Sequence, residues 1–140
     1  PHVFVHDVGK EPPDFLRGVI DAIVTEGWLG PARTGAPLPR EADEIFQKVQ
    51  TLLQNLLRYA DEVLKPGGRV IVTVPAFRVK KRLVHFPLEN LRLSDWTREP
   101  LVPDTWRSFP LFREAGRGTL LYGRPDALVL REVVRMRRMR

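Results

Sequence analysis

Residues 41–75 read EADEIFQKVQTLLQNLLRYADEVLKPGGRVIVTVP, and two hydrophobic periods follow one another in this stretch. From residue 41 to residue 64 the apolar side chains recur every three or four positions, which predicts an amphipathic helix. The sequence KPGG at 65–68 then ends the helix, because proline breaks it and glycine accepts a left-handed conformation. Residues 70–74 are all β-branched and predict a strand.

A second strand is predicted upstream, at residues 19–25. These residues are nearly continuous in apolar side chains, which is typical of a strand buried on both faces of a parallel sheet. A loop rich in glycine and proline follows at 31–39. Strand, loop, long helix and strand together predict a βαβ unit, in which the strands at 19–25 and 70–74 are parallel.

The outer segments give weaker patterns. Residues 3–5 predict a short strand, and Pro13 can begin a short helix at 13–16. Residues 83–86 predict another short strand, and the prolines between 87 and 110 favour loops around Trp96 and Trp106. The last two predicted strands form an antiparallel hairpin that closes the sheet. They lie at 119–122 and 127–134.

Length and composition indicate one globular domain, since the chain has 140 residues, of which 43% are hydrophobic. The absence of cysteine excludes disulfides and thiolate metal sites and fits a cytoplasmic protein. His2, His6 and His85 lack the spacing of metal ligands, so no metal site is expected. No apolar run approaches the roughly 20 residues that span a bilayer, so no membrane association is expected.

The charge is basic, with 23 Lys and Arg against 17 Asp and Glu. Two clusters hold much of the excess. The first comprises Arg78, Lys80, Lys81 and Arg82, and the second comprises Arg131, Arg135, Arg137, Arg138 and Arg140. Such clusters favour anionic partners, nucleic acid first, and the first cluster is our candidate nucleic-acid-binding site. The alternative is a solvated surface with a frayed basic tail.

Three segments together resemble a known family. IDAIVTEGWLGP at 20–31 is similar to the strand-and-loop motif of amino-methyltransferases, in which an acidic residue or Asn precedes Pro-Pro and an aromatic residue. VLKPGGRV at 63–70 is similar to a common helix-to-strand joint of class I methyltransferases. YGRPD at 122–126, with REV at 131–133, resembles the terminal hairpin of archaeal-type tRNA guanine-N2 methyltransferases and their DNA-methylase relatives.

The resemblance implies an α/β fold, a partial Rossmann-like methyltransferase sheet that is mostly parallel with a C-terminal antiparallel hairpin. Residues 1–140 then correspond to the C-terminal portion of a methyltransferase domain. The family's glycine-rich cofactor loop has no counterpart here, so we expect the N-terminal cofactor-binding portion to precede residue 1. The implied cofactor is S-adenosylmethionine. Asp7 and Val8 are the residues expected to touch its adenine, although we expect the chain alone to bind it poorly.

The same resemblance implies methyl transfer to an exocyclic amine of a base in tRNA or another nucleic acid. The candidate catalytic residues are Glu26, Gly27, Trp28 and Leu29, which stand where the family pattern has Asp-Pro-Pro-Tyr. The Glu26 carboxylate or the Gly27 carbonyl would accept hydrogen bonds from the amine, and Trp28 would stack on the base. Simpler roles are a capping or salt-bridging Glu26, a core-packed Trp28 and an ordinary turn at Asp7.

Two other hypotheses come from the same residues. The chain could be a non-catalytic accessory subunit that binds nucleic acid and has lost the cofactor site. A partner chain, or the missing N-terminal region, could also supply strands that complete the sheet. Without those strands, residues 19–25 form an exposed edge, and we expect the isolated chain to self-associate or to be poorly stable.

Overall fold

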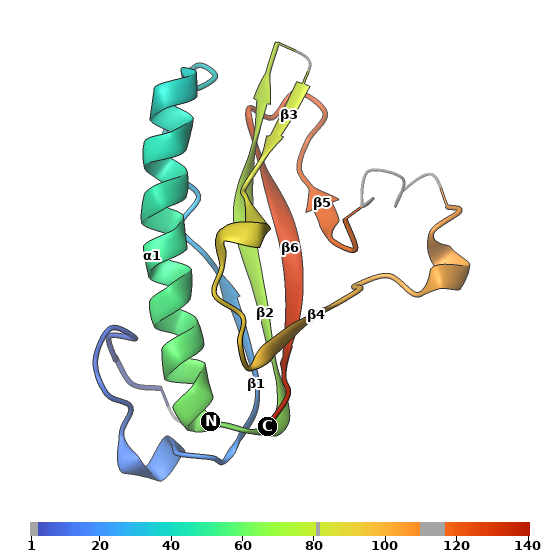
Figure 1. The fold of residues 1–140 in the computed structure, drawn as a ribbon. Coiled ribbons are helices and arrows are strands. Elements are labelled where there is room, and N and C mark those ends of the chain that lie inside the picture. The colour runs from blue at the N-terminus through green and yellow to red at the C-terminus, as the bar shows by residue number, and fades with distance from the viewer. Residues whose placement is uncertain (1–2, 81, 110–116) are drawn as a thin grey trace.

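The computed structural model describes residues 3–80, 82–109 and 117–140, and places one long helix beside a six-stranded sheet (Figure 1). In chain order, the elements are the 3-10 turn Asp14–Leu16, strand β1 (Ile20–Glu26), helix α1 (Pro39–Val63), strand β2 (Leu64–Val79), strand β3 (Arg82–His85), the 3-10 turn Leu88–Asn90, strand β4 (Trp96–Glu99), the 3-10 turn Asp104–Trp106, strand β5 (Leu120–Tyr122) and strand β6 (Val129–Arg138).

Helix α1 forms where the three-to-four-residue period predicts it. Pro39 occupies the first turn, and the Glu41 carboxylate accepts a hydrogen bond of 2.8 Å from the backbone N–H of Leu38. One stripe of the helix is buried against the sheet and forms the core. Its members are Ala42, Ile45, Phe46, Val49, Leu53, Leu56, Leu57, Ala60 and Val63.

The predicted βαβ unit is confirmed, because β1 and β2 pair in parallel with α1 between them in the chain. The prediction of a mostly parallel sheet is wrong. The order is β1-β2-β6-β4, and the pairings of β2 with β3, β2 with β6, β4 with β6 and β5 with β6 are all antiparallel. Parallel neighbours need a long crossover, and among the described residues only α1 provides one.

Other predictions are partly corrected. The terminal hairpin is present as β5 and β6, and the short strand at 83–86 appears as β3. Residues 3–5 form no strand and pair with no strand in the described part of the chain, and Val5 is exposed. β4 was not predicted, because its sequence WTRE carries no apolar alternation. It forms because β6 offers an open edge for four antiparallel pairs.

The expectation that residues 19–25 are buried on both faces is also wrong. β1 lies at one edge of the order β1-β2-β6-β4 and pairs only with β2 among the described strands. An edge position is what we expect for residues 19–25 when no further strands extend the sheet. Of the residues of β1, only Ile20 and Ile23 pack against the core, and Val24 is 73% exposed. An apolar sequence therefore lies at an uncovered edge, which is a site for pairing with another chain.

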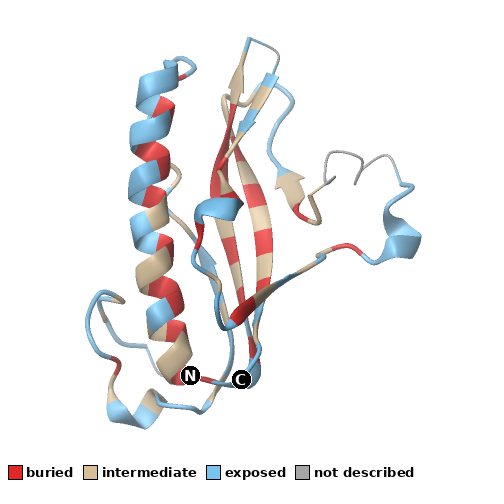
Figure 2. Cartoon of the chain, in the orientation of Figure 1, coloured by how far each residue is buried: buried red, intermediate tan, exposed pale blue. Residues whose placement is uncertain are grey.

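The sheet has one covered and one uncovered face. Along β2 and β6, buried residues alternate with half-exposed ones (Figure 2). The buried set packs on α1, so the alternate set points away from the helix. We call the uncovered surface the open face. It consists of Val24 and Glu26 of β1, Arg69, Ile71 and Thr73 of β2, and Arg131, Val133, Arg135 and Arg137 of β6.

A buried carboxylate ties three segments together. Glu132 of β6 is fully buried, and it accepts a hydrogen bond of 2.6 Å from Thr119 Oγ1. Its other oxygen lies 2.9 Å from His85 Nδ1, and Arg117 Nε is 3.6 Å from the carboxylate. These contacts hold β3, and the residues just before β5, against β6. The motif REV at 131–133 includes this residue, but the sequence does not predict its burial, because Glu132 sits in a strand that otherwise alternates in the ordinary way.

Asp61 gives the fold an expected pH dependence. Burial raises the pKa of the Asp61 carboxyl, and the positive charge of Arg138 opposes that rise. The folded state then holds a proton that the unfolded state has lost, so stability falls as pH rises through the raised folded pKa. We expect Asp61→Asn to make the urea midpoint decline less between pH 4 and pH 6, a window just above the ordinary aspartate pKa of about 3.9. Exposed Asp43→Asn is the control; equal slopes in wild type and Asp61→Asn would contradict the assignment.

Candidate functional site

The predicted catalytic loop begins at the carboxyl end of β1. Glu26 is the last residue of the strand and pairs with Thr73 of β2. The next backbone N–H, that of Gly27, donates a hydrogen bond of 3.2 Å to Thr73 Oγ1. A Cβ on Gly27 would lie 2.5 Å from the Thr73 carbonyl oxygen, so glycine permits this close approach. The loop is therefore held directly against the parallel strand pair.

Glu26 makes an ion pair that the sequence did not reveal. Arg131 Nε donates a hydrogen bond of 2.6 Å to Glu26 Oε1 across the open face. Both side chains are about half exposed, at 54% for Glu26 and 41% for Arg131. A surface pair of this kind contributes about 0–1 kcal/mol to stability, so its main effect is to orient the carboxylate. The salt-bridging role for Glu26 is thus present, and it leaves the carboxylate accessible.

Trp28 and Leu29 lie on different parts of the loop surface. Trp28 is 40% exposed, and its ring lies 5.9 Å from Lys48 Nζ of α1, which is within the range of a cation–π contact. Leu29 is half-buried at the rim of a hollow. Gly30 follows with φ of +103°, and a Cβ at this position would lie 3.4 Å from the Ile45 side chain, so the loop returns close to the helix. Trp28 is therefore partly exposed beside α1, whereas the Glu26 side chain lies on the open face.

Beside this loop lies a hollow of about 590 Å³, formed between residues 29–33 and the turn that joins β5 to β6. Its walls include Leu128 and Val129, and its cationic groups are Arg33, Arg124 and Arg131. Arg33 pairs with Glu41 at 3.0 Å through Nη2, while its buried Nη1 has no hydrogen-bond partner among the described residues. Asp126 also lines the hollow, 3.9 Å from Arg124 Nε. The guanidinium groups keep further N–H donors beside apolar walls, a combination that suits a planar, anionic ligand such as a nucleotide.

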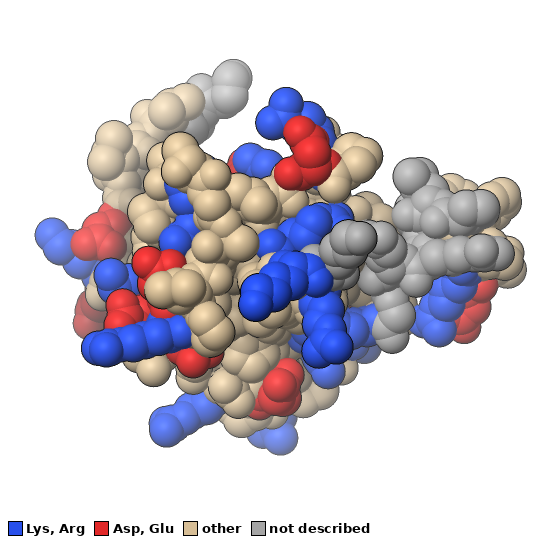
Figure 3. Space-filling model, turned by 90° about the horizontal axis from the view of Figure 1, so that it is seen from above, with Lys and Arg blue, Asp and Glu red and all other residues tan. Residues whose placement is uncertain are grey.

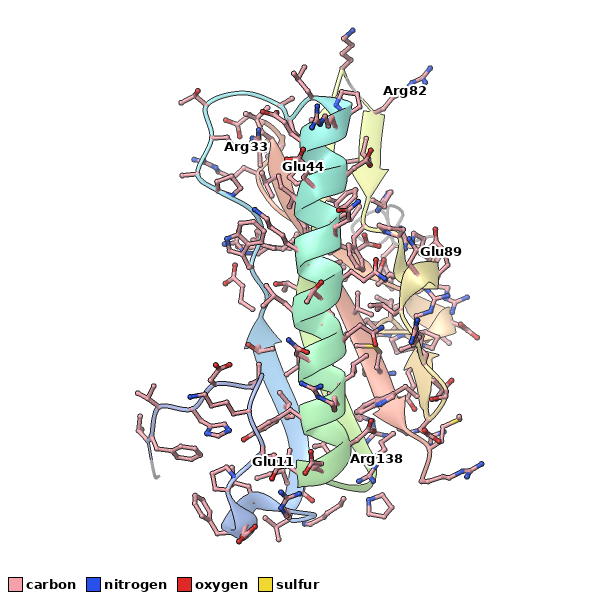
Figure 4. The ribbon with its side chains drawn as sticks, turned by 60° about the vertical axis from the view of Figure 1, so that its left-hand side comes forward. Glu11, Arg33, Glu44, Arg82, Glu89 and Arg138 are labelled. Carbon is pink, nitrogen blue, oxygen red and sulfur yellow. The ribbon has the colours of Figure 1, made fainter. Side chains whose placement is uncertain are left out.

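The end of the molecule that carries the N-terminus of α1 is rich in cations. Figure 4 labels Arg33 and Arg82 at this end, from the loop before α1 and from β3, and Arg138 at the other end. Figure 3 views the molecule from above, toward this end, and shows Lys and Arg side chains gathered near its middle.

The structure places the predicted nucleic-acid-binding cluster at the tip of the β2–β3 hairpin, at this same end (Figure 1). Arg78 is tied to the β5–β6 turn, since its backbone N–H donates to the Leu128 carbonyl at 2.9 Å. Lys80 adopts a positive φ of 45° at the hairpin turn, and Arg82 is exposed. Lys81 lies outside the described residues.

The structure does not bring the predicted cofactor contacts to Glu26. Asp7 forms a turn, in which its Oδ1 accepts a 2.8 Å hydrogen bond from the N–H of Gly9. Val8 lines a small hollow with Tyr59 and Glu62, in the last turns of α1. Because α1 runs back along β1, these turns lie at the amino end of β1, whereas Glu26 is at its carboxyl end (Figure 1).

The second basic cluster is not a frayed tail, because four of its arginines lie in β6. Arg131 pairs with Glu26, and Arg135 and Arg137 pair with Glu99 at 3.3 and 3.0 Å. Arg138 binds the Leu64 carbonyl at the start of β2 and lies 3.9 Å from Asp61. The directions of these side chains are therefore determined by the pairing of β6 with β2, which alternates residues between the two faces of the sheet.

Neither a metal-binding cluster nor a membrane-spanning helix is found in the described ranges. Within residues 3–80, 82–109 and 117–140, no group of three or more His, Asp or Glu side chains is arranged to hold a metal ion. The same ranges contain no helix that is both long and apolar enough to cross a membrane.

Comparisons with known proteins assign no family. No family model and no curated protein sequence matches the chain. Among solved structures, it is similar to a candidate DNA modification methylase from Thermus thermophilus, with 18% identity and a TM-score of 0.46 over 89% of this chain. A second structure of that protein, complexed with S-adenosyl-L-methionine, gives 16% identity and a TM-score of 0.40. The chain spans about half the length of that protein, 48% and 49% in the two comparisons.

Proposed function

We propose that this chain supplies the acceptor side of an S-adenosylmethionine-dependent methyltransferase that methylates an exocyclic amine of a nucleic-acid base, with tRNA as the expected substrate. The observation that carries the proposal is the position of the Glu26 carboxylate. It stands at the carboxyl end of a parallel strand, is oriented by Arg131 and adjoins the arginine-lined hollow. Ligands of α/β sheets bind at the carboxyl ends of parallel strands.

The proposed chemistry depends on positioning. An exocyclic amine is a poor nucleophile because its lone pair is delocalised into the ring of the base. Hydrogen bonds from the amine to the Glu26 carboxylate and the Gly27 carbonyl would hold it with the lone pair directed toward a methyl donor. The exposed face of Trp28 would stack on a base that has left its helix, and Leu29 would pack at the rim.

Asp7 and Val8, the two residues expected to contact the methyl donor, do not lie beside Glu26. Asp7 uses its carboxylate in a local turn, and Val8 lies among residues at the far end of α1. The cofactor contact that the resemblance implies for these two residues stays a prediction. We place the donor's site in an N-terminal portion of the same protein, or in a partner chain, and assign to this chain the binding and orientation of the acceptor base.

Methyl transfer tests the proposal directly. The polypeptide that contains this chain in its natural reading frame is incubated with tritiated S-adenosylmethionine and unmodified tRNA. We expect Glu26→Gln to slow transfer about tenfold or more, because the amide retains only one acceptor oxygen and donates from the other position. Glu11→Gln, an exposed carboxylate in the N-terminal segment, is the control with unchanged transfer. Equal rates for wild type and Glu26→Gln, or transfer to no nucleic acid, would refute the proposal.

A further inference from the structure

The open face carries an unbalanced row of arginines. Arg69, Arg131, Arg135 and Arg137, which we call the arginine stripe, project from β2 and β6 on the side away from α1. Among the described residues, the carboxylates that pair with them are Glu26 and Glu99. We propose that the open face binds single-stranded nucleic acid along the arginine stripe. The inference shares with the proposed function only the nucleic-acid partner and requires no methyl transfer.

One end of the stripe concentrates positive charge around a single carboxylate. Glu99 of β4 is contacted by Arg69 Nε at 3.2 Å, Arg135 Nε at 3.3 Å and Arg137 Nε at 3.0 Å. Glu99 itself is only 20% exposed, whereas Arg69 and Arg137 are about half exposed. Three guanidinium groups around one carboxylate leave two positive charges in excess, and each group has several N–H donors. A phosphodiester is the complementary group, because guanidinium binds phosphate oxygens in a two-pronged geometry.

The stripe leads to the candidate site. Arg137 and Arg131 are six residues apart in β6, so their backbones are about 20 Å apart in an extended strand. Arg131 ends this row and also lines the hollow that holds Arg33 and Arg124. A nucleic-acid strand lying along β6 would therefore meet Arg137 and Arg135 first, pass Val133, and reach Arg131 at the rim of the hollow.

An exposed aromatic side chain beside the arginine stripe indicates which kind of partner the open face would bind. Tyr122 of β5 is 67% exposed and pairs in register with Arg131, so its ring lies beside the stripe. Exposed aromatic rings next to cations on a sheet surface suit unpaired bases, which stack on the ring while phosphates meet the guanidinium groups. An apolar protein partner would instead leave the excess charge buried and uncompensated. A single strand matches both features of the surface.

Fluorescence anisotropy with a labelled single-stranded oligonucleotide of mixed sequence tests this inference on the full chain. We expect the double variant Arg135→Gln/Arg137→Gln to bind about tenfold more weakly at low salt. Its plot of log affinity against log salt should be shallower by about two, one for each phosphate contact removed. The matched control Arg58→Gln/Arg92→Gln removes the same charge from exposed residues on the helix side and should bind within twofold of wild type.

Equal losses in the two double variants would overturn the proposal, since they would show a response to net charge alone. The proposal would also be overturned if a second copy of the chain covered the open face. Light scattering would then show a dimer, and this dimer would not bind the oligonucleotide. Photocrosslinking on the wild-type chain needs no variant to fold: crosslinks to peptides of β6 and β5 support the proposal, and crosslinks confined to α1 reject it. If this chain binds the oligonucleotide while the polypeptide that contains it transfers no methyl group to tRNA, the proposed function is refuted and this inference stands.

Discussion

Replacement of Phe77 by alanine is expected to lower the free energy of unfolding by about 3–5 kcal/mol, the largest effect of any change considered for this chain. Phe77 of β2 is fully buried, and its ring stacks on Phe46 of α1 with centroids 5.3 Å apart. Phe46 in turn contacts Phe86 edge-on at 5.7 Å. Truncation would remove apolar burial, leave a cavity and break the only aromatic stack that joins helix to sheet among the described residues.

Urea unfolding followed by circular dichroism measures this loss. Phe15→Ala is the matched control, because Phe15 is 68% exposed and its removal should change stability by no more than about 0.5 kcal/mol. Phe77→Leu should fall between wild type and Phe77→Ala, since it keeps most of the buried volume. A Phe77→Ala variant as stable as Phe15→Ala would mean that the Phe46–Phe77–Phe86 cluster does not hold α1 to the sheet.

The second large effect is expected at Gly27, where the candidate site meets the fold. A Cβ there would lie 2.5 Å from the backbone carbonyl oxygen of Thr73, a contact that no rotation of a side chain can relieve. Gly27→Ala would have to push the end of β1 away from β2 and stretch the hydrogen bond from Gly27 N–H to Thr73 Oγ1. We expect a loss of about 2–3 kcal/mol, typical of overpacking against a rigid neighbour.

Gly35→Ala separates this contact from a general effect of losing glycine. No atom lies within 4 Å of the position where the Gly35 Cβ would stand, so alanine there should be neutral or slightly stabilising. Thermal and urea unfolding of both variants give the comparison. If Gly27→Ala melts with wild-type stability, the loop after β1 does not approach β2 as closely as the structure shows, and the position of Glu26 is in doubt with it.

The parts of the fold that the sequence predicted well are those with a long, regular period. Helix α1 and the parallel pair β1–β2 follow from a 25-residue amphipathic pattern between two β-branched runs. β4 and the coil at residues 3–5 could not be predicted this way, because four residues of mixed polarity carry no period and an apolar triplet can be exposed. In both cases the availability of a neighbouring strand edge decides the outcome.

The sequence identified the loop that forms the candidate site, but it did not identify the residues that contact this loop. The loop from Glu26 to Leu29 was identified by residue type, and it does follow a parallel strand. Arg131, which orients Glu26, is 105 residues away in sequence, and no local pattern links the two. Asp7 shows the reverse case: its predicted role assumed a strand at residues 3–5, and without that strand it lies at the other end of α1.

Sequence alone determined the elements that depend on local chemistry: that a long helix lies close to residues 41–64, that β2 follows it, and that the connection between β1 and β2 is a parallel crossover. Tertiary structure decided everything that depends on which strands become neighbours. Placing antiparallel β6 beside β2 turned an apparent basic tail into a row of arginines on one face and brought Arg131 to Glu26. The reason is geometric: alternation assigns side chains to two faces, but only strand pairing and the position of α1 determine which face stays open.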